Sequence, residues 1–94
     1  MIQSSFDPLL LRTFLAVAET RHFTAAGQRL GLSQSTVSQH IRRLEEQAGR
    51  PLLLRDTHSV TLTTDGEAMR GFATTILEAH ARAAAFFAGT ELRG

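Results

Sequence analysis

The sequence of 94 residues contains no cysteine, no lysine and no tyrosine. Without cysteine the chain can form no disulfide and has no thiolate metal ligand and no cysteine nucleophile. Without lysine and tyrosine almost nothing titrates between the α-amino group and the arginines. The isoelectric point of about 9.1 therefore says little about binding partners, because the formal net charge is only +1.

Long apolar runs are absent as well. No stretch approaches the roughly 20 apolar residues that span a bilayer, and residues 1–5 show no signal-peptide pattern. The length and the hydrophobic content of 43% suit one small domain, which often relies on a partner chain for stability. We therefore expect a single domain in the cytoplasm, without membrane contact.

Charge is distributed unevenly along the chain. Residues 29–55 carry five arginines and two glutamates, a net charge of +3, whereas residues 56–94 carry three arginines and five carboxylates, a net charge of −2. A basic middle followed by an acidic tail indicates a local site for a polyanion.

Hydrophobic periodicity predicts three helices in the first half of the chain. The first begins at Asp7 and Pro8, which suit an N-cap and a first helical position, and runs to about Thr20. The caps expected for the second and third helices are Thr24 and Ser33, and the expected stops are Gly31 and Gly49. The buried face predicted for the third helix consists of Val37, Ile41, Leu44 and Ala48.

After the third helix the hydrophobic period changes to two. Leu52 and Leu54 alternate as one predicted strand, Val60 and Leu62 as a second, and residues 56–59 form the turn between them. A long helix is expected from about residue 65 to residue 87. The sequence thus predicts a mainly α fold, in which three helices are followed by a two-stranded hairpin (52–62) and a long final helix.

Residues 23–42 match the twenty-residue helix-turn-helix pattern. Gly27 supplies a small residue where the two helices cross, and Gly31 accepts a left-handed turn without steric cost. The second helix of this motif is the third predicted helix of the chain. The positions that face away from its apolar side are Gln34, Ser35, Thr36, Ser38, Gln39 and Arg42. Such side chains can bond to base edges in a major groove, although an ordinary helical hairpin with a solvated polar face is the alternative.

Several longer segments give a more specific indication. They are FLAVAE (14–19), FTAA (23–26), LSQSTVSQHIRRLE (32–45), GRPLLLR (49–55) and LTTDG (62–66). Together these segments resemble the DNA-binding domain of the LysR-type transcriptional regulators of bacteria. The resemblance runs without a gap from about residue 6 to residue 66.

The resemblance implies a winged helix-turn-helix in residues 6–63, with three helices and a two-stranded wing, and a linker helix for dimerisation at 64–88. It also implies a third helix in the major groove of double-stranded DNA, a wing on the backbone or minor groove, and pairing of two subunits by the linker helix on an inverted-repeat operator. It implies base contacts by Gln34, Ser35, Thr36, Ser38 and Gln39, phosphate contacts by Ser33, Arg42 and Arg55, and a wing contact by His58. His58 and Ser59 stand where arginine is usual, so we expect a weaker wing. Gly27 stands where a second alanine is usual.

The family's effector-sensing domain does not follow in this sequence. We expect an excised domain that binds neither effector nor cofactor; a naturally short protein is the alternative.

A stripe of six residues in the long helix follows the 4-3-4-3-4 spacing of a coiled-coil seam. Its members are Met69, Ala73, Ile76, His80, Ala83 and Phe87. We expect this stripe to hold a homodimer together; packing on the helix's own domain is the alternative. For the function of the whole chain, the alternatives to a LysR-type DNA-binding domain are a DNA-independent helical interaction module and a winged-helix repressor of another family.

The four histidines lie on different predicted elements without ligand spacing, so we expect no metal site. No nucleophile elbow or phosphate-binding glycine loop is present, and we expect no catalytic residue.

Overall fold

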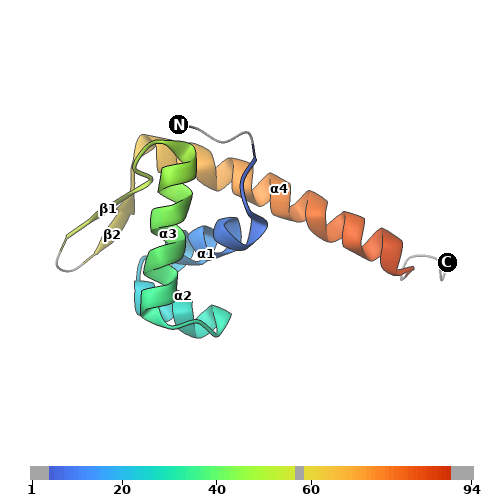
Figure 1. The fold of residues 1–94 in the computed structure, drawn as a ribbon, viewed down its shortest axis with the longest axis horizontal. Helices are drawn as coiled ribbons and strands as arrows, with labels where there is room; N and C mark the ends of the chain where they lie inside the picture. Colours follow the sequence, from blue (N-terminus) through green and yellow to red (C-terminus); the bar gives the residue numbers. More distant parts are fainter. Residues whose placement is uncertain (1–4, 57–58, 90–94) are drawn as a thin grey trace.

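The computed structural model describes residues 5–56 and 59–89. The elements along the chain are α1 (Pro8–Thr20), α2 (Phe23–Leu30), α3 (Gln34–Ala48), β1 (Leu53–Arg55), β2 (Val60–Leu62) and α4 (Thr64–Ala88). The hairpin projects at one side of the helical unit, and α4 runs out at the other (Figure 1). The predicted fold class, mainly α with a two-stranded wing and a long final helix, is confirmed.

Side-chain caps set three of the helix starts. The Asp7 carboxylate accepts from the Leu9 N–H at 2.9 Å, and the Ser33 hydroxyl accepts from the Thr36 N–H at 3.1 Å. Thr63 caps α4 by accepting from the Gly66 N–H. Each cap satisfies an amide at a helix start that has no partner within its helix.

The cap predicted for the second helix is wrong. His22, not Thr24, is the N-cap of α2, and its Nδ1 accepts from the Ala25 N–H at 3.3 Å. The helix therefore begins at Phe23, whose side chain is 8% exposed and belongs to the core. An imidazole nitrogen can replace the usual cap oxygen because it offers one lone pair to an amide.

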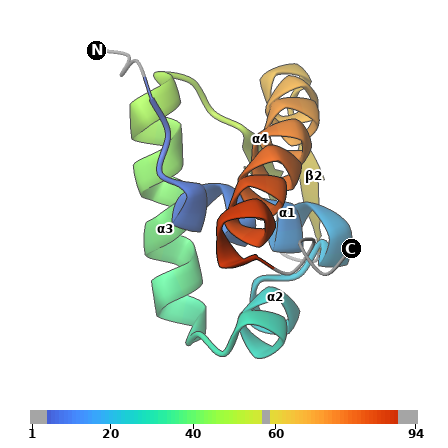
Figure 2. The same cartoon turned by 90° about the vertical axis from the view of Figure 1, so that its right-hand side faces the viewer.

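The core forms around α1, which packs against α2, α3 and α4. Seen from the C-terminal end of α4, α3 lies to one side of α1 and α2 lies below it (Figure 2). The largest side chains that are fully buried include Leu10, Leu11, Phe14, Ile41, Leu44 and Leu52. Burial of such side chains is the main favourable contribution to the stability of a domain of this size.

The hairpin differs from the predicted alternation in its first strand. β1 and β2 pair in antiparallel register, with Leu53 opposite Leu62 and Arg55 opposite Val60. Leu52 is buried but precedes the strand, and Leu54 is 59% exposed, so the prediction that these two share a face is wrong. The Leu52 carbonyl accepts from the Thr63 N–H at 3.0 Å, but the strand itself begins one residue later, at Leu53, so Leu52 does not share the strand's alternation.

Helix α4 consists of two parts with different surroundings. Met69 and Ala73 are 7% and 0% exposed and lie in the core of their own domain. Beyond them Ile76 is 40% exposed and Phe87 is 84% exposed. Met69 and Ala73 are therefore not available for the predicted seam, because the first turns of the helix pack on α1. The exposed members of the stripe are Ile76, His80, Ala83 and Phe87.

Candidate nucleic-acid interface

Helix α3 is anchored to the rest of the domain by one face only. Val37 and Ile41 are fully buried, and His40 between them is 9% exposed. Nδ1 of His40 lies 2.8 Å from the Thr13 hydroxyl of α1. The Thr13 hydroxyl donates to the Leu9 carbonyl at 3.1 Å, so its oxygen accepts from Nδ1–H of His40.

This contact was not predicted from the sequence, although position 40 shares a helix face with Val37 and Leu44. The signal was the spacing 37-40-41-44, which places the imidazole on the apolar side of α3. A buried imidazole needs a hydrogen-bond partner, and Thr13 provides it.

The opposite face of α3 is exposed and polar. Its side chains line a shallow hollow of about 430 Å³, formed by Gln34, Ser35, Ser38, Gln39 and Arg42. Thr36, predicted to face bases with them, is half-buried and does not line this hollow. Its hydroxyl accepts from the Ser33 hydroxyl at 3.0 Å, so both groups take part in the cap of the helix.

A glycine brings α2 and α3 close enough to form one rigid unit. A Cβ built on Gly27 would lie 2.5 Å from the Leu32 carbonyl oxygen and 3.4 Å from a Val37 methyl group. The Gly27 carbonyl in turn accepts from the Leu32 N–H at 2.8 Å. Gly31 makes the turn between the helices at φ 73°, in the left-handed region. The two glycines of the motif therefore have the roles that the sequence predicted.

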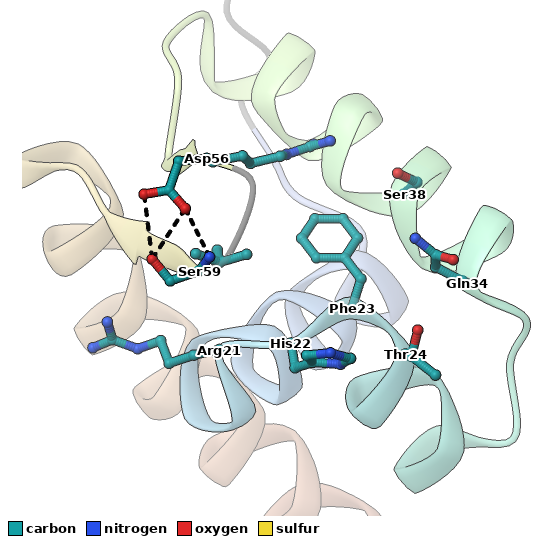
Figure 3. Close-up of a pocket in the computed structure, with 10 residues that line it drawn as sticks. Arg21, His22, Phe23, Thr24, Gln34, Ser38, Asp56 and Ser59 are labelled. Carbon is teal, nitrogen blue, oxygen red and sulfur yellow. Dashed lines mark hydrogen bonds between the residues drawn. The ribbon is translucent and has the colours of Figure 1, made fainter.

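A second hollow, of about 280 Å³, lies between the wing and the two helices (Figure 3). Gln34 and Ser38 of α3 lie on one side of it, and Asp56 and Ser59 of the wing on the other, with Phe23 between them. Its further lining residues are Arg21, His22, Thr24, Arg55 and Val60. The N-terminal half of α3 and the wing thus share one concave surface.

Arg55 is held at the edge of this second hollow. Its guanidinium carbon lies 4.6 Å from the centre of the Phe23 ring, a cation–π contact. The Asp56 carboxylate accepts from the Ser59 N–H at 2.8 Å and thereby closes the turn of the wing. His58, predicted as a wing contact, lies outside the described residues.

The structure thus brings together the predicted residues of α3 and Arg55. It adds Arg21, His22 and Thr24, of which the sequence indicated only Thr24, and that only as a helix cap. The signal for them was a short polar and basic stretch directly before the helix-turn-helix.

The described part of the chain contains no group of three or more His, Asp or Glu that could hold a metal ion. His22 caps α2, His40 bonds to Thr13, and His80 is exposed on α4. In the same residues no helix is long and apolar enough to cross a membrane.

Two helices joined by a left-handed glycine turn, followed by a hairpin beside the second helix, define a winged helix-turn-helix domain. The family model for the bacterial regulatory helix-turn-helix proteins of the lysR family matches residues 9–67. The chain belongs to this family.

Similar proteins include transcriptional regulators from several bacteria. The transcriptional activator IlvY of Salmonella typhimurium is 51% identical over 63 residues, which are 67% of this chain and 21% of the relative. The transcriptional regulator BudR of Klebsiella aerogenes is 57% identical over 58 residues, 62% of this chain and 41% of the relative. The chain therefore spans less than half the length of these relatives.

Among solved structures, the CbnR DNA-binding domain in complex with DNA has a TM-score of 0.85 and 31% identity, and the match covers 92% of this chain and 99% of that one. The BenM DNA-binding domain in complex with catB site 1 DNA has a TM-score of 0.83 and 30% identity, covering 87% and 91%. Both similarities extend well into α4.

Proposed function

We propose that this chain binds double-stranded DNA sequence-specifically and serves as the operator-reading part of a cytoplasmic transcriptional regulator, without catalytic activity. The observation that carries the proposal is the exposed polar face of α3, which continues into the hollow lined by Arg55. The DNA complexes of the similar CbnR and BenM domains support it.

In this proposal α3 enters the major groove with its N-terminal turns. Gln34 and Gln39 offer amides that can bridge the N6 and N7 atoms of adenine, and Ser35 and Ser38 lie beside them. Arg42 lies about two turns beyond Gln34 and contacts phosphate, as does Arg55 from the wing. His40 and Thr13 orient the helix from behind, because their hydrogen bond joins α3 to α1.

The same proposal includes a homodimer on an inverted-repeat operator. The exposed half of α4 carries Ile76, Phe86 and Phe87, which are 40%, 59% and 84% exposed in one chain. A two-fold dimer covers such an apolar surface and gives the complex the symmetry of an inverted repeat.

Binding to DNA at several salt concentrations tests the proposed function. We expect log Kd to depend steeply on log salt, because each neutralised phosphate releases condensed counterions. Arg55→Ala should weaken binding to every sequence about equally and lower the slope by about one. Arg12→Ala is the matched control, since Arg12 is an exposed arginine outside both hollows.

Selection of bound sites from random DNA then tests specificity. We expect a two-fold related pair of half-sites with their centres about one helical turn or a multiple of it apart. A chain that dimerises but binds DNA without salt dependence and selects no sequence would be an interaction module instead.

A further inference from the structure

The connection between α1 and α2 contains an unusual backbone conformation. Arg21 has φ 58° and ψ 24°, and it is the one residue other than glycine with a positive φ in the described segments 5–56 and 59–89. The left-handed region is disfavoured for a residue with a Cβ, and glycine occupies it without cost. Strained residues of this kind cluster at binding sites.

The backbone at this position does not require an arginine. The Arg21 N–H donates to the Val17 carbonyl at 2.7 Å and ends α1, and a glycine N–H can do the same. What the arginine adds is its guanidinium group. Nε donates to the Ala18 carbonyl at 2.9 Å, which fixes the side chain along the end of α1.

Within residues 5–56 and 59–89, the two terminal amino groups of this guanidinium have no carboxylate partner. The ion pairs within the described residues join Arg29 to Glu19 and Arg50 to Asp65, and Arg21 takes part in neither. An exposed arginine held at Nε, with its amino groups open, is prepared to bind an anion with little loss of side-chain entropy.

Arg21 lines the hollow between α3 and the wing (Figure 3). Arg55 is another of its lining residues. If α3 occupies the major groove and the wing the adjacent minor groove, the sugar–phosphate strand between the two grooves crosses this hollow. A phosphodiester there meets Arg55 from the wing and Arg21 from the start of the helix-turn-helix.

We propose that Arg21 is a DNA phosphate contact, and that it binds the backbone strand between the recognition helix and the wing. This inference rests on the proposed function. The contact supplies affinity and fixes the position of the domain on the duplex, and it reads no base.

Arg21→Gly is the sharpest test, because it removes the guanidinium and leaves a residue that prefers the observed backbone. We expect Kd to rise about 3- to 10-fold for operator and scrambled DNA alike, and the salt slope to fall by about one. The thermal midpoint should stay the same or rise. Arg12→Ala, which removes the same charge from the exposed face of α1, should change Kd less than 2-fold.

A second variant separates the phosphate contact from the cap of α1. Arg21→Gln keeps an N–H donor for the Ala18 carbonyl but carries no charge, and we expect it to lower the salt slope as Arg21→Gly does. If both variants keep the parent's Kd and salt slope, Arg21 is only a helix cap and the inference is wrong. A loss confined to operator DNA would also overturn it, because it would make Arg21 a base reader. Failure of the parent chain itself to bind DNA would instead overturn the proposed function.

Discussion

Nδ1 of His40 lies 2.8 Å from the hydroxyl oxygen of Thr13, and this hydrogen bond joins α3 to the central helix α1. Both side chains are buried, at 9% and 0% exposure. The bond therefore lies directly behind the face that we propose for DNA, and its loss affects both stability and the position of α3.

Thr13→Val should lower the free energy of unfolding by about 1–3 kcal/mol, because it leaves the imidazole of His40 buried without its partner. Urea unfolding at constant pH measures the change. Thr74→Val is the matched control, since the Thr74 hydroxyl likewise donates to the carbonyl four residues earlier but is exposed. We expect the control to change stability by less than about 0.5 kcal/mol. Equal effects of the two variants would show that the His40 bond contributes nothing.

Gly27→Ala should destabilise the domain, although alanine is the better helix former by about 1 kcal/mol. The new methyl group would lie 2.5 Å from the Leu32 carbonyl oxygen, so the turn between α2 and α3 must shift. We expect a net loss of about 1–3 kcal/mol, as for overpacked cores.

Gly71→Ala provides the comparison for this prediction. A Cβ at Gly71 meets nothing within 4 Å, so the variant should gain up to about 1 kcal/mol from helix propensity alone. Thermal unfolding of the two variants should therefore move in opposite directions. A stabilised Gly27→Ala variant would mean that the turn adapts to the methyl group without cost.

The elements of the fold could be predicted from the sequence because their signals are local. Asp7, Ser33 and Thr63 are side-chain caps, and Gly31 and Gly49 provide left-handed stops. The exception was α2, where a histidine nitrogen took the place of the expected threonine oxygen. Histidine is not among the preferred N-cap residues, which are serine, threonine, aspartate and asparagine, so the sequence did not indicate this cap.

Contacts between distant segments could not be predicted in the same way. The hydrogen bond from His40 to Thr13 spans 27 positions, and Arg55 contacts Phe23 across the domain. The division of α4 into a buried and an exposed half was also missed, because a heptad pattern looks the same whether its apolar residues face a partner or their own core. Met69 and Ala73 face their own core.

Ile76→Asp should convert a dimer of this chain into a monomer, because it puts a charge into the exposed part of the α4 stripe. Light scattering at high micromolar concentration measures the change. Ile76 is 40% exposed in one chain, so the variant should keep its fold, which a charge at the fully buried Ala73 would not. Thr75→Asp, at an exposed neighbouring position, should remain dimeric. A monomeric parent would show that the stripe is not a dimer interface.

Gln34→Ala and Gln39→Ala should reduce the preference for operator DNA, whereas Arg42→Ala should weaken binding to all DNA. All three residues line the exposed hollow of α3, but Gln34 lies in the first turn and Arg42 two turns later. The first turns of a recognition helix point deepest into the major groove. Each bidentate contact of a glutamine amide with adenine contributes about 1–3 kcal/mol of discrimination.

Binding to operator and scrambled DNA at two salt concentrations separates these roles. The glutamine variants should lose about 5- to 160-fold in operator affinity, which is about 1–3 kcal/mol, with little change on scrambled DNA. Arg42→Ala should lose affinity for both and lower the salt slope by about one. Glu46→Gln is a suitable control, because Glu46 is exposed on the same helix but does not line this hollow. Full operator preference in both glutamine variants would move the base-reading role to Ser35 and Ser38, the other side chains on this face of α3.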